Sequence, residues 1–203
     1  HTRCLSDWRF RRVLFRSFLK MNKTDLSLYT TGDYVIGAGP VKRILWYLTN
    51  ILFFMNPLNP VSKIKVLLLR LFGAKIGVGV NIKPSVNIKY PWKLTVDDFT
   101  WIGEKAWIDN LAPVTIGKNC CISQGAMLLC GNHNFKKVTF DLIVKEIIME
   151  DGAWVGAHAV VTPGVICRSH SVLAVNSVAT RNLEAYSIYQ GNPAVKIKDR
   201  IIE

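Results

Sequence analysis

The sequence predicts an all-β solenoid, in which the chain winds into a three-sided parallel coil behind two short helices. From Ile76 onward a large apolar residue recurs at every sixth position, and a small or β-branched residue follows most of these four positions later. An α-helix repeats its apolar residues every 3.6 positions and a strand every 2, so a period of six indicates a repeat architecture. The large residues, called anchors below, are Ile76, Ile82, Ile88, Val96, Ile102, Ile108, Ile116, Ile122, Leu128, Met149, Val155, Val161, Cys167 and Leu173.

One large and one small inward position per hexad fit a coil with three flat faces, in which three hexads make one coil of about 18 residues. The period slips by two residues at 90–94 and again at 110–113, and Trp92 fits the small position badly. A glycine often follows the anchor, as at Gly77 and Gly156, and we expect the backbone to turn tightly there. Short sandwich strands are the alternative, but they would alternate with period two. The small inward residues are Val80, Val86, Thr100, Ala106, Cys120, Ala126, Ala153, Ala159, Val165, Ser171 and Ser177.

The composition suits one globular core, with 203 residues of which 50% are hydrophobic. The net charge of +12 is uneven: residues 1–20 and 21–75 each carry +5, whereas residues 76–203 carry +2. A nearly neutral body argues against a nucleic-acid groove running through it.

The five cysteines form no C-x-x-C pair, and a core of this size needs no disulfide. We therefore expect a reducing cytoplasm as the compartment.

The chain divides into four segments. We expect residues 1–20 to be an upstream extension outside the native protein, which would then start at Met21; a cationic targeting peptide is the alternative, although the segment lacks a continuous apolar stretch. The other three segments are an N-terminal helical cap at 21–75, the coil at 76–183 with an inserted loop at 129–148, and a C-terminal tail at 184–203.

Two helices are expected in the cap, at 42–55 and 61–72. Ser62 would cap the start of the second helix, and Gly73 would end it. These helices would close the open first coil, as the end of any solenoid requires. They are also basic and moderately amphipathic, which leaves open a peripheral contact with an anionic membrane. No segment reaches the roughly 20 apolar residues of a membrane-spanning helix.

Several later segments resemble a known family. The run V-G-A-H-A-V-V-T-P-G-V-I, followed by S-V-A-T-R-N and G-N-P-A-V-K-I-K, resembles the hexapeptide-repeat acyltransferases. The segments F-G-A-K-I-G, Y-P-W-K-L, W-I-D-N-L-A-P-V-T-I-G and F-D-L-I-V-K are similar to the colanic acid biosynthesis acetyltransferase branch of that family. The resemblance covers residues 42–201. It implies a left-handed parallel β-helix of hexapeptide repeats, a homotrimer, and acetyl-coenzyme A as co-substrate.

A candidate catalytic residue lies where the repeat is interrupted, between Leu128 and Met149. A loop of this length in a compact solenoid is typical of a functional segment, and it places His133 beside Asn134. Acyl transfer from a thioester to a hydroxyl needs a base, and an imidazole titrates near neutrality. The resemblance implies the same residue, because the catalytic histidine of the family lies in such a loop; many members have Asp where this chain has Asn134. A surface histidine without function is the alternative.

The donor site is taken from the resemblance. It implies that Ala157 and Val175 line the pantetheine arm of acetyl-coenzyme A, that Thr180 and Arg181 meet its distal end, and that Lys198 approaches a phosphate. The family usually has Gly-Ala-Gly where this chain has A-V-N at 174–176. The alternative for Arg181 and Lys198 is that they are ordinary surface charges.

For the acceptor, the slip at 110–113 favours Asp109 and Asn110, together with Asn134 of the loop, as contacts to a sugar. The alternative is that the slip is a plain bulge without a function.

His158 and His170 follow their anchors at outward positions and are expected to be turn residues. Neither they nor the paired cysteines at 120–121 have the spacing of a zinc site, so we expect no metal. Trp154 is expected to pack at an interface or platform.

These observations predict an O-acetyltransferase that moves an acetyl group from acetyl-coenzyme A to a sugar hydroxyl, in exopolysaccharide biosynthesis, with His133 as general base. The expected acceptor is a saccharide or a lipid-linked oligosaccharide, and the expected place is the cytoplasm, with peripheral attachment to the inner face of the membrane. The alternatives are acetylation of a small xenobiotic or an amino sugar, metal-dependent hydration, and a non-catalytic β-helix for assembly or binding.

Overall fold

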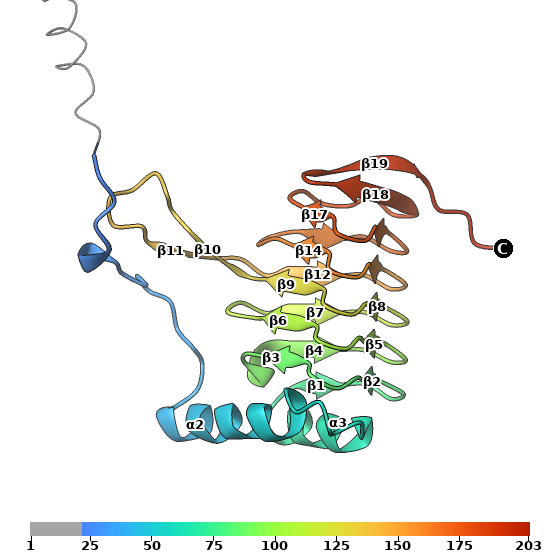
Figure 1. Ribbon diagram of the computed structural model, residues 1–203, viewed down its shortest axis with the longest axis horizontal. Coiled ribbons are helices and arrows are strands. Elements are labelled where there is room, and N and C mark those ends of the chain that lie inside the picture. The colour runs from blue at the N-terminus through green and yellow to red at the C-terminus, as the bar shows by residue number, and fades with distance from the viewer. Residues whose placement is uncertain (1–21) are drawn as a thin grey trace, which may run out of the picture. The chain divides into compact units, whose positions relative to one another are not determined.

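The computed structural model describes residues 22–203, so the expectation for residues 1–20 lies outside the described part of the chain. These residues form two units, each treated by itself. The tip unit comprises residues 22–32 and 133–142, and the coil unit comprises residues 33–132 and 143–203. Figure 1 shows the coil unit as a stack of similar turns that ends on a pair of helices.

The coil unit confirms the three-sided parallel coil that the period of six predicts. Each turn contributes one short strand to each of three sheets, and strands in neighbouring turns pair in parallel. Face 1 consists of β1 (Lys75–Ile76), β4 (Leu94–Val96), β7 (Val114–Ile116), β12 (Ile147–Met149) and β15 (Ile166–Cys167). Face 2 consists of β2 (Asn81–Ile82), β5 (Trp101–Ile102), β8 (Cys121–Ile122), β13 (Trp154–Val155), β16 (Val172–Leu173), β18 (Ser187–Gly191) and β19 (Ala194–Asp199). Face 3 consists of β3 (Asn87–Ile88), β6 (Trp107–Asp109), β9 (Met127–Leu129), β14 (Val160–Val161) and β17 (Val178–Ala179).

The core lies inside this prism and consists of the residues that the repeat selects. Every anchor and every small inward residue named above is buried. The tail also joins the coil, because β18 pairs in parallel with β16. The last strand, β19, then turns back and pairs with β18 in the antiparallel direction.

The expected reason for the glycines after the anchors is wrong. These glycines lack a positive φ; the left-handed conformation instead occurs three residues after an anchor. A Cβ added to Gly103 would lie 2.6 Å from the backbone nitrogen of Gln124 in the next turn, so glycine is needed there because two backbones approach closely. Besides four glycines, the residues with a positive φ at the third position are Ser85, Phe99, Lys105, Asn119, His158, His170 and Asn176.

We expect Gly103→Ala to lower the free energy of unfolding by about 1–3 kcal/mol, because the added methyl group overpacks a rigid contact between turns. Gly39→Ala is the matched control, since a Cβ at Gly39 meets no atom within 4 Å. Urea denaturation followed by circular dichroism would measure both changes. Equal stability of the two variants would show that neighbouring turns can separate without cost.

The helical cap agrees with the expected helices, apart from one capping residue. The first helix is α2 (Pro40–Thr49), which continues as the π-helical turn η2 (Asn50–Phe54), and the second is α3 (Ser62–Leu71). Gly73 follows α3 with a φ of +98°, which confirms it as the residue that ends the helix. Ser62 does not cap α3: its hydroxyl donates to Val80 O and accepts from the backbone N–H of Ile82.

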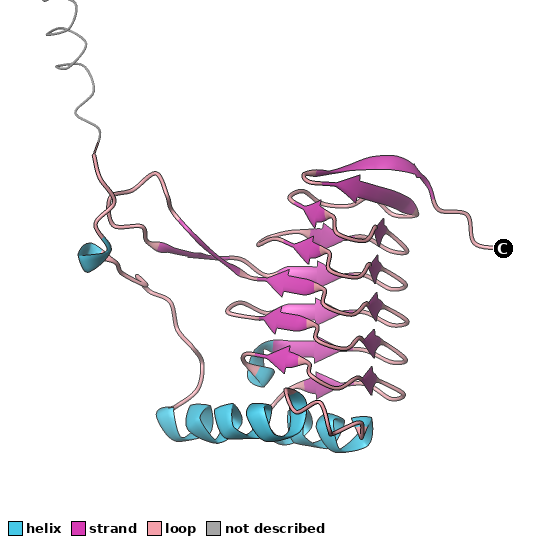
Figure 2. Cartoon of the chain, in the orientation of Figure 1, coloured by secondary structure: helices cyan, strands magenta, loops and turns pink. Residues whose placement is uncertain are grey.

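The cap satisfies the backbone groups that the first turn would otherwise leave unpaired. On face 3, the indole N–H of Trp46 donates to Ile88 O over 2.9 Å. On face 2, the buried Lys65 ammonium donates to Lys83 O over 2.8 Å, and its burial lowers its pKa. On face 1, the Arg70 guanidinium donates to the carbonyl of anchor Ile76 over 2.8 Å. Each face of the open end therefore has a partner in α2 or α3, the helices that lie across the first turn in Figure 2.

Two short 3-10 turns complete the described helices, η1 (Leu26–Leu28) in the tip unit and η3 (Pro91–Lys93) in the coil unit. The indole N–H of Trp92 in η3 donates to Ile36 O over 2.8 Å, which explains why this residue does not occupy the small inward position. Between residues 22 and 203, none of the helices has the length and apolar character needed to cross a bilayer.

All departures from the hexad period fall at one corner of the coil, where the chain leaves face 3 for face 1. After β3 the corner holds η3, and after β6 it holds residues 110–113. After β9 it holds the pair of strands β10 (Gly131–His133) and β11 (Leu142–Val144), which form a two-stranded sheet. We call this edge the insertion corner. The strands of face 1 keep their pairing register across all three insertions.

Candidate active site

The imidazole of His133 is held at the end of β10 by aromatic and polar contacts within the tip unit. Its Nδ1 lies 3.1 Å from Phe140 O. Its ring stacks on the ring of Phe140, with centroids 4.5 Å apart and an interplanar angle of 8°. The Tyr29 ring lies 5.7 Å from it on the other segment of this unit. These contacts restrict the imidazole to one orientation.

The contact with Phe140 O also assigns the protonation of the ring. A carbonyl oxygen only accepts hydrogen bonds, so Nδ1 carries the proton in the neutral imidazole. The lone pair then lies on Nε2, which is the atom able to take a proton from a substrate. The geometry of His133 thus suits a general base.

Asn134 shapes the turn that follows the histidine. Its side-chain Oδ1 accepts from the backbone N–H of Lys136 over 3.2 Å, and its own backbone N–H donates to Asp141 O over 2.8 Å. The Lys137 ammonium lies 3.0 Å from the Asp141 carboxylate across the same turn. These bonds account for Asn134 as a turn residue, and they leave its predicted contact with the acceptor as a hypothesis.

The preceding segment, residues 22–32, forms part of the tip unit, and sequence analysis gave no sign of this. The backbone N–H of Asp25 donates to Val138 O over 2.9 Å, and the N–H of Leu142 donates to Thr30 O over 3.3 Å. With Tyr29 beside His133, this segment contributes to the surroundings of the candidate base. No periodicity or motif in 22–32 points to this role.

In the coil unit, Asp109 lies at the foot of the hairpin. Its carboxylate pairs with the Lys89 ammonium over 2.9 Å and is partly exposed. A Cβ added to Gly131, the first residue of β10, would lie 3.9 Å from Asp109 Oδ2. Asp109 is thus the acidic side chain at the root of the strand that leads to His133.

The expectation for Asn110 needs correction. Asn110 was expected to contact a sugar, which requires an exposed side chain, but Asn110 is fully buried. Its Oδ1 accepts from the N–H of Tyr90 over 2.9 Å, and its amide donates to Tyr90 O over 2.6 Å. The oxygen and the amide nitrogen of the Asn110 side chain thus both bond to the backbone of the preceding turn at the insertion corner, so the residue has a structural role.

Two further side chains brace the same corner, and no motif or spacing in the sequence points to either. The Lys93 ammonium donates to Leu111 O over 2.6 Å and to Val35 O over 2.9 Å. The Tyr34 hydroxyl also donates to Leu111 O, over 3.0 Å. Burial raises the pKa of the Tyr34 hydroxyl and lowers the pKa of Lys93. The carbonyl of Leu111, in the slip, therefore has two charged or polar donors.

Two of the five predicted donor-site residues share one corner. Ala157 and Val175 both follow strands of face 2 in successive turns, and the N–H of Asn176 donates to Ala157 O over 2.9 Å. Ala157 is half-buried and Val175 is exposed. These two positions are therefore neighbours along the edge between face 2 and face 3.

The other three lie elsewhere on the coil. Thr180 and Arg181 are exposed and follow β17, at the edge between face 3 and face 1. Lys198 lies on β19, opposite Ile188 at the start of β18 on face 2. The described chain thus distributes the predicted donor residues over separate edges, and a single copy does not gather them into one cleft.

The internal histidines behave as predicted. His158 and His170 both have a positive φ at the third position after their anchors, which identifies them as turn residues. His170 stacks on Tyr186 with centroids 4.7 Å apart. The described residues 22–203 contain no group of three His, Cys, Asp or Glu side chains placed to hold a metal ion. Trp154 is exposed and donates from its indole N–H to Ser123 Oγ over 2.9 Å.

We expect the three buried cysteines of the coil, Cys120, Cys130 and Cys167, to react slowly with alkylating reagents in the native protein. Burial raises the pKa of Cys120 and of Cys130 to about 11 and that of Cys167 to about 12. At pH 8 a thiol with a pKa of about 11 is only about one part in a thousand thiolate. Labelling with iodoacetamide at pH 8, read by peptide mass spectrometry, should be at least about a hundredfold slower than in urea. Equal rates in both states would contradict the burial of these thiols.

Comparisons with known proteins agree with this architecture. No family model matches the chain. A relative named as the colanic acid biosynthesis acetyltransferase WcaF of Escherichia coli (strain K12) is 34% identical over 177 residues, which cover 87% of this chain and 97% of the relative. The solved hexapeptide-repeat containing acetyltransferase VCA0836 from Vibrio cholerae O1 biovar eltor, complexed with acetyl coenzyme A, has a TM-score of 0.74 at 20% identity, and the match covers 84% of this chain and 95% of that one. A galactoside acetyltransferase in complex with coenzyme A has a TM-score of 0.69 at 20% identity, and the match covers 79% of this chain and 81% of that one.

The solved structures confirm the predicted left-handed β-helix of hexapeptide repeats. The extent of the identity with WcaF, over nearly the whole length of both chains, decides the family. The chain belongs to the hexapeptide-repeat acetyltransferases, in the branch of the colanic acid biosynthesis acetyltransferases.

Proposed function

We propose that this protein transfers an acetyl group from acetyl-coenzyme A to a sugar hydroxyl in exopolysaccharide biosynthesis, with His133 as the general base. Nε2 of His133 takes the hydroxyl proton while the hydroxyl oxygen attacks the thioester carbonyl carbon. When the C–S bond breaks, its electron pair stays on sulfur, which takes the proton back from the imidazolium. The products are the O-acetyl sugar and free coenzyme A, and no covalent enzyme intermediate forms.

The observation that carries this proposal is the hydrogen bond between His133 Nδ1 and Phe140 O. It holds the lone pair of the neutral imidazole on Nε2, and the stacked Phe140 ring fixes the direction in which that lone pair points. The name of the relative WcaF supports a link to exopolysaccharide biosynthesis, and a galactoside O-acetyltransferase among the relatives supports a sugar as acceptor. Asp109 and Asn134 are proposed as the acceptor contacts.

The donor site is proposed to form between copies of the chain in a homotrimer. Ala157 and Val175 would line the pantetheine arm, Thr180 and Arg181 would meet the distal end, and Lys198 would pair with a phosphate. The spread of these residues over separate edges of one copy supports a site that a neighbouring copy completes. The solved relatives bound to acetyl coenzyme A or coenzyme A support the same donor for this protein.

The reaction is proposed to take place in the cytoplasm at the inner face of the membrane, where a lipid-linked oligosaccharide would be the acceptor. Acetyl-coenzyme A is a cytoplasmic donor, and five cysteines without an even disulfide framework suit a reducing compartment.

Mass spectrometry of the products would test the function. The purified protein is incubated with acetyl-coenzyme A and a panel that holds lipid-linked oligosaccharides, free sugars, amino sugars and chloramphenicol. We expect one added acetyl group, labile to mild base as an ester is, on a saccharide. Acetylation of an amine or of chloramphenicol alone would favour the xenobiotic or amino-sugar alternative. Absence of transfer to every acceptor would favour a non-catalytic β-helix.

A further inference from the structure

The segment that contains the cap has a composition unlike the rest of the coil unit. Residues 34–96 contain nine Lys or Arg residues and no Asp or Glu residue. Residues 97–203 contain ten basic and eleven acidic residues. The positive charge of the described chain is therefore concentrated at the end of the coil that α2 and α3 cover.

The side of the cap that faces away from the coil is apolar. Along α2 and η2, the side chains of Trp46, Asn50 and Phe54 are buried against the coil. On the outward side, Leu45 and Leu52 are 53% and 60% exposed. We call the outward apolar residues of both helices and their connection the cap face; they are Val41, Leu45, Leu48, Leu52, Leu58, Ile64, Leu67 and Leu71, all exposed.

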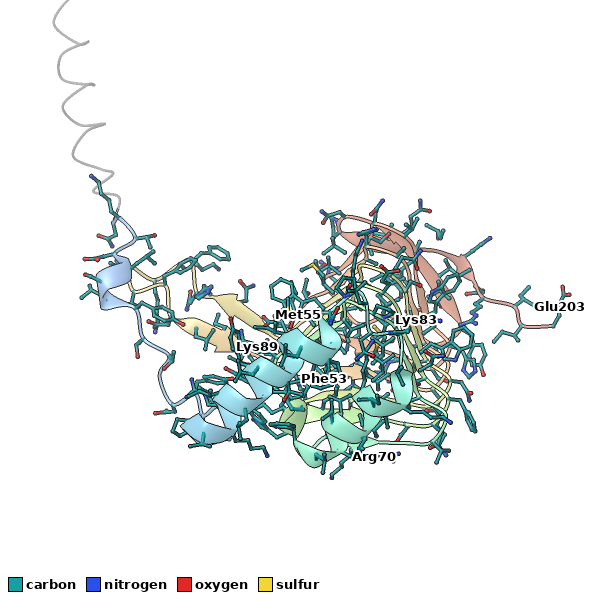
Figure 3. The ribbon with its side chains drawn as sticks, turned by 60° about the horizontal axis from the view of Figure 1, so that its bottom comes forward. Phe53, Met55, Arg70, Lys83, Lys89 and Glu203 are labelled. Atoms are coloured by element: carbon teal, nitrogen blue, oxygen red, sulfur yellow. The ribbon has the colours of Figure 1, made fainter. Side chains whose placement is uncertain are left out.

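This apolar character has no explanation in capping. The cap pairs the open backbone groups through its inward side, by way of Trp46, Lys65 and Arg70. A segment that only ends a solenoid needs a polar outer side to stay soluble. Here the outer side combines leucines with the exposed cation Lys63 of α3, and Figure 3 looks onto this end of the coil, with Phe53 and Met55 labelled at the end of the first helix. Helices of ten residues with an apolar side and a basic border suit the surface of an anionic bilayer.

A pocket of about 670 Å³ opens beside the cap face, between α2 and the first turns of face 3. Its wall includes the cations Arg43 and Lys89 and the aromatic or apolar side chains of Tyr47, Met55 and Trp107. Two cations above an apolar wall match a molecule with a phosphate next to a hydrocarbon chain. The volume lies in the range of ordinary ligand sites.

One residue of the pocket wall also contacts the root of the hairpin. Lys89, in its wall, pairs with Asp109 over 2.9 Å. Asp109 lies at the foot of β10, near Gly131. A ligand whose phosphate meets Arg43 and Lys89 would therefore place the group attached to that phosphate next to the proposed acceptor residue.

We propose that the cap face binds an anionic lipid bilayer and that the pocket takes the phosphate and adjoining hydrocarbon of one lipid molecule from it. The inference deepens the proposed function, on which it rests for one point, that the sugar to be acetylated is carried by that lipid phosphate. The cations then serve two purposes: Lys63, Lys75 and Lys83 attract the charged surface, and Arg43 with Lys89 selects a phosphate-bearing lipid.

The surface is tested by flotation of the full chain with phosphatidylcholine vesicles, with and without phosphatidylglycerol, in the absence of donor and acceptor. We expect binding only to the vesicles with phosphatidylglycerol, weakening as salt is added. The triple variant Lys63→Gln, Lys75→Gln, Lys83→Gln should bind roughly a hundredfold more weakly, at about fivefold for each charge lost. The matched control, Lys105→Gln, Lys118→Gln, Lys145→Gln, removes three exposed charges elsewhere on the coil and should bind like the wild type.

Three results would overturn the surface proposal: no binding of the wild type, equal binding to both kinds of vesicle, or equal loss in the two triple variants. A second variant, Leu45→Ser with Leu48→Ser and Leu52→Ser, should lose at least about tenfold in binding. Circular dichroism would report the fold of each variant. His133→Gln should bind vesicles as the wild type does, so failure of the catalytic proposal and failure of this one are distinguishable.

The pocket is tested with a soluble probe, farnesyl phosphate, by quenching of tryptophan fluorescence, since Trp46, Trp92 and Trp107 line the pocket. We expect saturable binding of farnesyl phosphate, and none of farnesol or inorganic phosphate at the same concentration. Arg43→Gln should weaken the binding about tenfold. Equal binding of farnesol, or no effect of Arg43→Gln, would overturn the assignment of the phosphate to this pocket.

Discussion

Replacement of His133 by Gln should lower the turnover of acetyl-coenzyme A by about two to four powers of ten. Glutamine can still donate from its amide to Phe140 O, so the turn can keep its shape, but it has no atom that takes a proton at neutral pH. The loss should appear in kcat, with little change in the KM for the donor, because His133 acts on the acceptor hydroxyl. Release of free coenzyme A, followed with a thiol reagent, measures both constants.

His170→Asn is the matched control for this experiment. His170 is a histidine of the coil unit, it has a φ of +56°, and asparagine accepts that conformation. We expect its kcat to stay within about twofold of the wild type, since surface changes away from a site are small. Retention of more than half of the activity in His133→Gln would remove this residue from the mechanism and leave the base unassigned.

Replacement of Trp46 by Ala should lower the free energy of unfolding by about 3–5 kcal/mol. The indole is 3% exposed and packs edge-on against Phe54 and Phe72, with ring centroids 5.2 Å and 5.1 Å away. Its removal leaves a cavity under α2, and it also deprives Ile88 O, at the open edge of face 3, of its donor. Both losses act at the junction between cap and coil, so the first turn should fray.

Tyr47→Ala is the control for the tryptophan, because it removes an aromatic side chain from the next position of the same helix. Tyr47 is 64% exposed, so its loss should change the stability by no more than about 0.5 kcal/mol. Urea denaturation followed by circular dichroism compares the two, and hydrogen exchange locates the change. If Trp46→Ala unfolds at the same urea concentration as Tyr47→Ala, the cap does not stabilise the coil.

The sequence was sufficient for the coil because the pattern that builds it is local. An anchor and a small residue in each hexad suffice to predict which side chains point inward, and every one of them is buried. The place of His133 in the long insertion was predictable for the same reason, since an interruption is visible against a strict period. Its contact with Phe140 was not, because it depends on the path of the loop.

The errors concern contacts between neighbouring turns, which one turn of sequence does not contain. Gly103 was expected to be a turn residue. Glycine is instead required there because the backbone of Gln124 in the next turn lies too close for a Cβ atom. Asn110 looked exposed, but its amide bridges to Tyr90 in the turn before. Ser62 looked like a helix cap, but its hydroxyl bonds to the first turn of the coil. Each of these residues has its partner 18–21 positions away in the sequence. Nothing in the local sequence identifies such a partner, because a hydroxyl or a carboxamide can bond to many different groups.

Because all insertions fall at the insertion corner, the length of the chain can change along one edge of the prism while the strands of the three faces stay paired. Face 1 resumes its pairing after the five residues 89–93, after the four residues 110–113, or after a hairpin. The hairpin that carries His133 can therefore be exchanged, by evolution or by design, without a change in the rest of the coil. Chimaeras between distant relatives should be tolerated at this edge, and selectivity for the acceptor can diverge while the stability of the prism is left alone.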